Sequence, residues 1–107
     1  MAFHDGHRAR VRQRYIEDGL DGFKEHEVLE MLLFYCLARK DTNELAHRLL
    51  EEFGTLQAVM SAKPAQLAKV PGVGSAAGTF LAFINDFNRY MQVRKIEQQS
   101  SALLTIE

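Results

Sequence analysis

The sequence of 107 residues predicts an all-α fold, a compact bundle of five or six helices. Apolar residues recur three and four positions apart in one segment after another, which is the spacing of one helix face. Glycine and proline residues separate these segments, and no run alternates apolar and polar residues for long enough to indicate a β-strand. The composition, with 47% hydrophobic and 25% charged residues, is typical of a globular protein, and the length fits a single domain.

The first two predicted helices cover residues 7–19 and 24–38. The first has no helix breaker before its end and carries one modest apolar stripe. The second is apolar on nearly all sides after Glu30, so we expect it to be the buried central helix. Arg39 and Lys40 follow it, and positive charge is favoured at the C-terminal end of a helix.

Two further helices are expected over residues 41–54 and 55–62. Asp41 and Glu44 have the spacing of a capping box, in which two side chains bond free amides at a helix start. Pro64 suits the first position of the short helix that follows, because proline has no amide hydrogen to satisfy there.

A long last helix is expected over residues 74–97, after which the helical pattern is lost. We therefore divide the chain into a helical domain of residues 1–97 and a segment 98–107, a linker or the start of a missing C-terminal domain. The apolar positions of the helices predict one core. Its expected members are Leu29, Leu32, Leu33, Leu45, Leu49, Phe53, Leu67, Val70, Phe80, Ile84 and Phe87.

The net charge of −1 conceals a segregation of charge. Arg8, Arg10, Arg12 and Arg14 follow one another without an acid between them. Arg8 and Arg12 share one side of the helix, and the other two share another. We interpret the series as a solvated helix face, with a track for phosphates as the alternative. The balanced total excludes a strongly cationic domain that binds nucleic acid by charge alone.

Cys36 is the only cysteine, so an intramolecular disulfide is excluded. It stands in an apolar run, where it is expected to be a small buried hydrophobic residue rather than a nucleophile. That run, residues 28–38, is too short to cross a bilayer, and the N-terminus lacks the apolar stretch of a signal peptide. The sequence predicts a soluble cytoplasmic protein.

Chemistry-bearing side chains are sparse. His4 and His7 are close in sequence but have no further ligands beside them, so we expect neither a metal nor a cofactor. His26 and His47 each stand alone on a helix. No paired carboxylates and no nucleophile with a base occur at a plausible site, so catalysis by this chain is not expected.

The segment "KVPGVGSAA", residues 69–77, places a glycine hairpin between two helices. Gly72 and Gly74 can take positive φ and have no Cβ, so the backbone can be approached closely. Gly74 also begins a helix, where free amides and the helix dipole favour an anion, commonly a phosphate. Val70 and Val73 are expected to anchor the hairpin in the core.

The stretch "LAKVPGVGSAAGTFL" resembles the helix-hairpin-helix motif of DNA-repair proteins. The combination "GHR…R…GL…E.LE.LL…RKDTN.LA..LL..FG" resembles the N-terminal half of the bacterial RadC family, over residues 6–97. The resemblance implies an all-helical domain with a degenerate first hairpin around "RKDTN" and a second one at residues 69–77. It also implies a following JAB/MPN-type metal-hydrolase-like domain, whose paired-histidine motif does not occur in this sequence.

The hairpin departs from strong DNA-binding members of that motif, which place a lysine or arginine just inside the second helix. Ser75, Ala76 and Ala77 stand there instead, and Gly78 stands where the family has alanine. The sequence predicts weak binding to double-stranded or branched DNA, without sequence specificity. The expected phosphate-binding residues are Lys69, Gly72, Gly74, Ser75 and Ala76, with Arg39 and Lys40.

The alternative is a protein-interaction or regulatory domain that binds a protein partner or positions the JAB/MPN domain, with little or no DNA binding. The neutral hairpin and the net charge of −1 favour it. A membrane partner is not expected under either interpretation.

Overall fold

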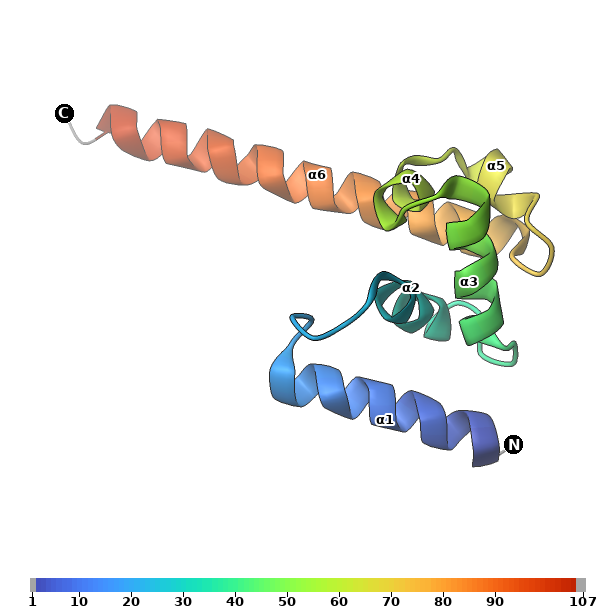
Figure 1. The fold of residues 1–107 in the computed structure, drawn as a ribbon. Helices are drawn as coiled ribbons and strands as arrows, with labels where there is room; N and C mark the ends of the chain where they lie inside the picture. The colour runs from blue at the N-terminus through green and yellow to red at the C-terminus, as the bar shows by residue number, and fades with distance from the viewer. Residues whose placement is uncertain (1, 106–107) are drawn as a thin grey trace.

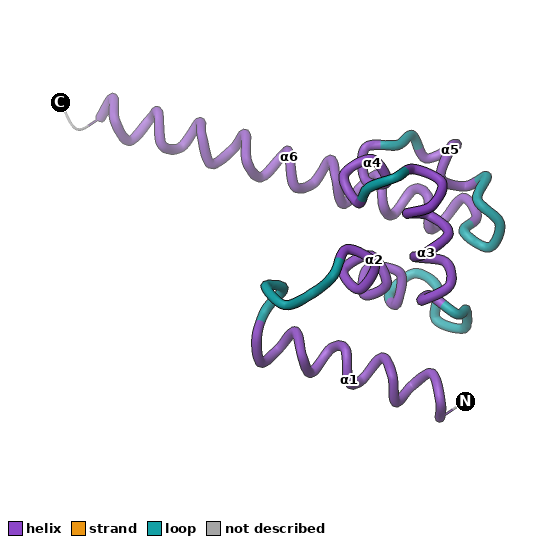
Figure 2. Tube along the Cα trace, in the orientation of Figure 1, coloured by secondary structure: helices purple, strands orange, loops and turns teal. Residues whose placement is uncertain are grey.

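The structure, a computed structural model, describes residues 2–105, with side chains for residues 6–101. It has six helices: α1 (Ala2–Asp18), α2 (Glu25–Phe34), α3 (Thr42–Phe53), α4 (Leu56–Ser61), α5 (Pro64–Ala68) and α6 (Gly74–Thr105) (Figure 1). No strand occurs between residues 2 and 105, and the loops are short connections (Figure 2). The predicted all-α fold is confirmed.

The helices form two packed groups joined at α3. In one group, α2 packs on α3 and α1 lies along α2; in the other, α5 and α4 cover the start of α6. The second half of α6 projects away from the bundle (Figure 1). The projection explains why the molecule measures 60 × 34 × 21 Å.

One core lies where α2, α3, α5 and the start of α6 meet. Six of the predicted members are buried in it: Leu29, Leu33, Leu45, Leu49, Leu67 and Val70. Three more, Leu32, Phe53 and Phe80, pack against it half-buried. Ile84 is only half-buried. The prediction that Phe87 belongs to the core is wrong, because its side chain is 50% exposed where α6 has left the bundle.

Two helix ends differ from the prediction. Helix α2 ends at Phe34 and not at residue 38, so Arg39 and Lys40 lie in a turn and not in the last turn of a helix. Helix α6 continues to Thr105, through residues that lose the apolar repeat. The proposed boundary between residues 97 and 98 stays a prediction, because a helix can also serve as a linker.

The predicted helix starts are confirmed. The Asp41 carboxylate accepts the amide of Glu44 at 3.1 Å, and Thr55 caps α4 in the same way. Pro64 is the first residue of α5. The Glu44 carboxylate does not complete the capping box, because it pairs with Arg48 one turn further along.

The interpretation of the arginine series as a solvated face is wrong for Arg8. Arg8 is 8% exposed and donates hydrogen bonds to carbonyl groups in and after α2. Arg10 and Arg14 are exposed, as expected for the opposite side of α1. The spacing along the helix therefore assigns the four arginines correctly to two sides of α1. Which of these two sides is buried depends on how α1 packs on α2.

Helix α1 is held on α2 by charged pairs as well as by buried Val11. Arg14 donates to Glu27 at 2.7 Å. At the other end of α1, Nε2 of His7 lies 3.0 Å from Oε2 of Glu30, a carboxylate that is 2% exposed. Glu30 is thus a buried acid inside the apolar helix, and the histidine supplies its partner.

The structure also corrects the view that His26 and His47 stand alone. Their rings stack across α2 and α3 with centroids 4.5 Å apart. Cys36 is half-buried against the core, and burial raises the pKa of its thiol, which keeps it protonated and unreactive. None of the helices described here combines the length and the apolar character that crossing a bilayer requires.

Candidate nucleic-acid interface

The hairpin between α5 and α6 has the conformation that its glycines predict. Gly72 and Gly74 have φ of +92° and +75°, values that favour glycine over every other residue. Val70 and Val73 are buried on either side, and the amide of Val73 donates to Val70 O at 3.0 Å. The expected anchoring of the hairpin in the core is confirmed.

Gly72 serves the protein's own packing. A Cβ at this position would lie 2.7 Å from Cδ2 of Leu45 on α3. Nearby, Arg48 of α3 donates to Pro71 O at 3.1 Å. A glycine here predicts a close approach by a ligand, but at Gly72 the close approach is made by α3, and this contact fixes the hairpin.

Gly74 is the glycine that faces outward. No atom lies within 4 Å of the position its Cβ would take. It begins α6 together with exposed Ser75 and Ala76. In the described part of the chain, the amides of Gly72, Gly74, Ser75 and Ala76 make no backbone hydrogen bond. These four N–H groups are hydrogen-bond donors at the positive end of a helix dipole.

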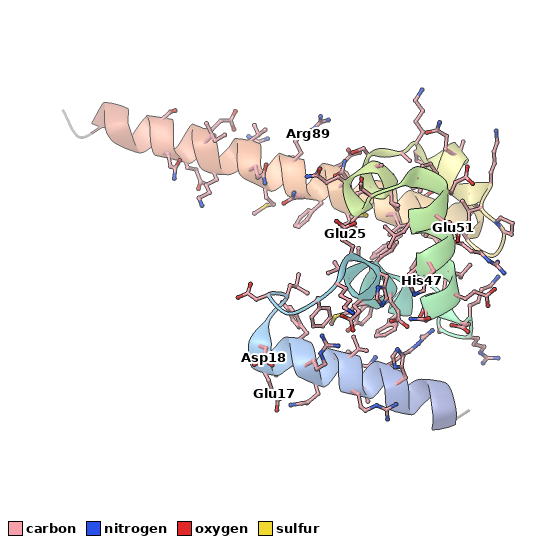
Figure 3. The ribbon with its side chains drawn as sticks, in the orientation of Figure 1. Glu17, Asp18, Glu25, His47, Glu51 and Arg89 are labelled. Carbon is pink, nitrogen blue, oxygen red and sulfur yellow. The ribbon has the colours of Figure 1, made fainter. Side chains whose placement is uncertain are left out.

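The charge beside the hairpin is mixed. Exposed Lys69 is the C-cap residue that follows α5, beside the hairpin glycines. It also lines a groove of about 560 Å³ between α3 and α5, together with Arg48 and the carboxylates of Glu51 and Glu52. Figure 3 shows Glu51 on α3. The acids oppose a phosphate on the α3 side, so an anion is favoured at the α6 side of the hairpin.

Arg39 and Lys40 form a second, separate group. Both are exposed in the turn of residues 35–41 between α2 and α3. This turn precedes α3, whereas the hairpin packs further along α3, on Leu45 and Arg48. In the view of Figure 1, both connections lie at the end of the molecule opposite the free end of α6. The structure thus brings the two groups to one end without bringing them into contact.

A metal centre has no basis in the described residues. Nowhere between residues 6 and 101 do three histidine, cysteine, aspartate or glutamate side chains converge on one point. His7 is engaged with Glu30. The side chain of His4, the other candidate, lies outside the described residues.

The sequence did not predict the roles of two arginines that hold the loops of the site in place. Arg48 fixes the hairpin and Arg8 fixes the turn of residues 35–41. Arg48 has no sequence signal apart from its charge. Arg8 belongs to the "GHR" segment of the family resemblance, which is the signal that pointed to it.

The fold and this site define a class of protein: a small all-helical domain with a glycine hairpin that presents free amides at a helix start. The particular family follows from comparison with known sequences. The family described as UPF0758 N-terminal matches residues 6–79, and the chain belongs to it. UPF0758 is the RadC family, so the resemblance noted above is confirmed at the level of the family.

Relatives in three bacteria share this domain. A UPF0758 protein of Fusobacterium nucleatum is 42% identical over 81 residues, which are 76% of this chain and 35% of the relative. One of Rhodobacter capsulatus is 42% identical over 66 residues, 62% of this chain and 31% of the relative. One of Ruegeria pomeroyi is 35% identical over 94 residues, 87% of this chain and 42% of the relative.

The matched part of the chain is thus about a third to two-fifths of the length of these relatives. No solved structure matches the chain significantly.

Proposed function

We propose that this domain binds DNA without sequence specificity, through a helix-hairpin-helix contact between a backbone phosphate and the amides of Gly72, Gly74, Ser75 and Ala76. The observation that carries the proposal is the set of four amides without a backbone partner, one in the hairpin and three at the start of α6, all on exposed residues. Such donors, aligned with a helix dipole, bind phosphate. A contact of this kind positions DNA but does not read bases.

Charged side chains supply the rest of the contact. Lys69 stands beside the hairpin, and Arg39 and Lys40 offer a second phosphate contact from the turn before α3. The acids of the groove and the missing cation at residues 75–77 keep the affinity low. Double-stranded or branched DNA is the proposed partner, and a cytoplasmic location and a role in DNA repair belong to the proposal.

The first prediction adds the charge that the hairpin lacks. Replacing Ala76 by lysine is expected to strengthen duplex binding and to steepen the slope of log affinity against log salt by about 0.9. Ala76 is exposed, so the fold should tolerate the change. Fluorescence anisotropy with labelled duplex, forked and single-stranded DNA at two salt concentrations measures the effect.

A matched control places the same lysine elsewhere. Gln92→Lys adds the charge on the projecting part of α6, far along the chain from the hairpin, and should change binding little. The reverse test is Gly74→Val, which is expected to block the amides and abolish binding while leaving helicity largely intact. If Ala76→Lys binds DNA no better than the wild type at low salt, the hairpin does not face phosphate.

A second candidate function rests on a different surface. On α6, the side chains of Phe83, Phe87, Tyr90 and Met91 are 50–60% exposed and share one helix face. They lie beyond residues 6–79, the part matched by the family. Exposed apolar stripes of this kind favour protein contact. The domain would then position a partner such as the JAB/MPN-type domain implied by the family, and DNA affinity would be absent at every salt concentration.

A further inference from the structure

Arg8 carries a buried positive charge and takes part in none of the direct ion pairs among the described residues; Glu30, which lines the same cavity, pairs with His7. Its Nη2 donates to Leu37 O and to Lys40 O, each at 2.9 Å, and its Nη1 donates to Phe34 O at 3.3 Å. The guanidinium carbon lies 5.0 Å from the centroid of the Phe34 ring. The charge is therefore balanced by carbonyl dipoles at the C-terminal end of α2 and in the turn after it.

The turn of residues 35–41 has few strong hydrogen bonds of its own beyond its first half. The amide of Leu37 donates to Leu33 O at 2.9 Å, but that of Lys40 reaches Leu37 O only at 3.4 Å. Arg8 bonds carbonyls at the beginning, middle and end of this stretch. Together with Asp41, whose carboxylate caps α3, it ties the exposed half of the turn to the rest of the protein.

We propose that Arg8 is a positioning residue for DNA binding: it holds the turn in the conformation that presents Arg39 and Lys40 to a phosphate. The inference rests on the proposed function. Arg8 does not touch DNA itself, because it is 8% exposed and its hydrogen bonds are directed to the turn. It acts through the two cations whose backbone it fixes.

A purely electrostatic role for Arg8 makes a different prediction. Lysine keeps the charge but loses the planar fork that reaches three carbonyls at once. If Arg8 acts by its charge, Arg8→Lys binds DNA as well as the wild type does. If it acts by positioning, Arg8→Lys is expected to lower duplex affinity about three- to tenfold, as the loss of one phosphate contact would.

The experiment measures duplex binding at low salt for wild type, Arg8→Lys and the matched control Arg10→Lys, which keeps its charge on the exposed side of α1. The control should bind normally. The same Arg8 change is then made in a chain that carries Arg39→Ala and Lys40→Ala. The proposal expects that Arg8→Lys has no further effect there, because nothing is left to position. An unchanged affinity of Arg8→Lys, or an equal loss in both backgrounds, overturns it.

A second variant covers the case in which Arg8→Lys does not fold. Ala38→Gly keeps every Arg8 hydrogen bond and adds backbone freedom to the turn, so affinity should fall about two- to fivefold. Again the loss should vanish in the Arg39→Ala, Lys40→Ala background; normal binding by Ala38→Gly contradicts the proposal.

If the wild type shows no salt-dependent binding of DNA, the proposed function is overturned, and the inference about Arg8 is overturned with it. If the wild type binds but the double alanine variant binds equally well, the hairpin function stands and only the inference is overturned.

Discussion

At the scale of residues, the two hairpin glycines have different tasks. Both have positive φ, but a Cβ at Gly72 would meet Leu45, whereas a Cβ at Gly74 would meet open space. Gly72 is therefore required for packing and Gly74 for conformation and for access to the amides. Sequence alone assigns both to one task, since each is a glycine in a turn.

This difference predicts unequal losses of stability. Gly74→Ala should lower the free energy of unfolding by about 1–2 kcal/mol, the cost of a left-handed conformation for a residue with a Cβ. Gly72→Ala should cost about 1–3 kcal/mol more, because the new methyl group presses on the buried Leu45 side chain. Urea denaturation of both variants measures the difference. Equal losses would show that Leu45 yields freely to the added methyl group.

A second effect at the scale of residues is the pH dependence of the ion pair between Arg14 and Glu27. The hydrogen bond from Arg14, with help from the backbone amide of Lys24, lowers the pKa of Glu27 from 4.5 to about 2. A lowered pKa in the folded state means that the pair stabilises the fold above pH 4.5 and loses its effect as the pH falls towards 2. The pair is partly exposed, so screening by solvent keeps its contribution to stability small.

Comparison of the wild type with Glu27→Gln tests this. The difference between their free energies of unfolding should be largest at neutral pH, shrink below pH 4.5 and vanish near pH 2. Glu52→Gln, an exposed acid on α3, is the control and should follow the wild type. A difference that stays constant into acid would mean that the Arg14 contact is not formed in solution.

At the scale of elements, α5 and α6 touch backbone to backbone. A Cβ on Gly78 would lie 2.8 Å from Pro64 O and 3.2 Å from the amide nitrogen of Ala68. The absence of a side chain at Gly78 lets the short helix lie directly on the long one and so closes the hairpin.

Gly78→Ala is therefore expected to destabilise the domain, although alanine is the better helix former. The gain in helix propensity is about 1 kcal/mol, whereas overpacking against rigid backbone costs about 1–3 kcal/mol. Thr79→Ala is the matched control, because it adds propensity on the exposed side of the same helix; it should stabilise slightly. Thermal denaturation followed by circular dichroism measures both, and a stabilised Gly78→Ala variant would contradict the packing argument.

At the scale of the whole molecule, the domain consists of a packed bundle and a helical projection. All described side chains from residue 86 to residue 101 are exposed. The core ends at Leu81, which is fully buried. The projecting half of α6 therefore contributes little to the stability of the bundle and is available to a partner.

Removal of residues 89–107 is accordingly expected to change the free energy of unfolding by less than about 0.5 kcal/mol, as for surface changes in general. Removal of residues 81–107 takes away Leu81 and should abolish cooperative unfolding. Denaturant titration of the two shortened chains makes the comparison. A large loss in the chain that lacks residues 89–107 would show that the removed part of α6, which includes Tyr90 and Met91, packs on the domain in solution.

The sequence by itself determined the local features of this protein. Helix identity, the caps at Asp41 and Thr55, the start of α5 at Pro64 and the hairpin glycines follow from the spacing of apolar residues and from backbone preference. These forces act within a few residues of the chain, so they can be read from it directly. The buried positions of α3 follow for the same reason, since its apolar face is long enough to have one orientation in the core.

Only the tertiary structure decided which faces are covered. Arg8 and Arg10 are alike in sequence, yet one is buried on the turn after α2 and the other is exposed. Phe87 continues the apolar repeat of Phe80 but lies beyond the last residue that α4 and α5 can reach. His26 and His47 meet because α2 packs on α3. Burial depends on contacts between residues distant in the chain, and an apolar or charged pattern does not state which partner arrives or where the bundle ends.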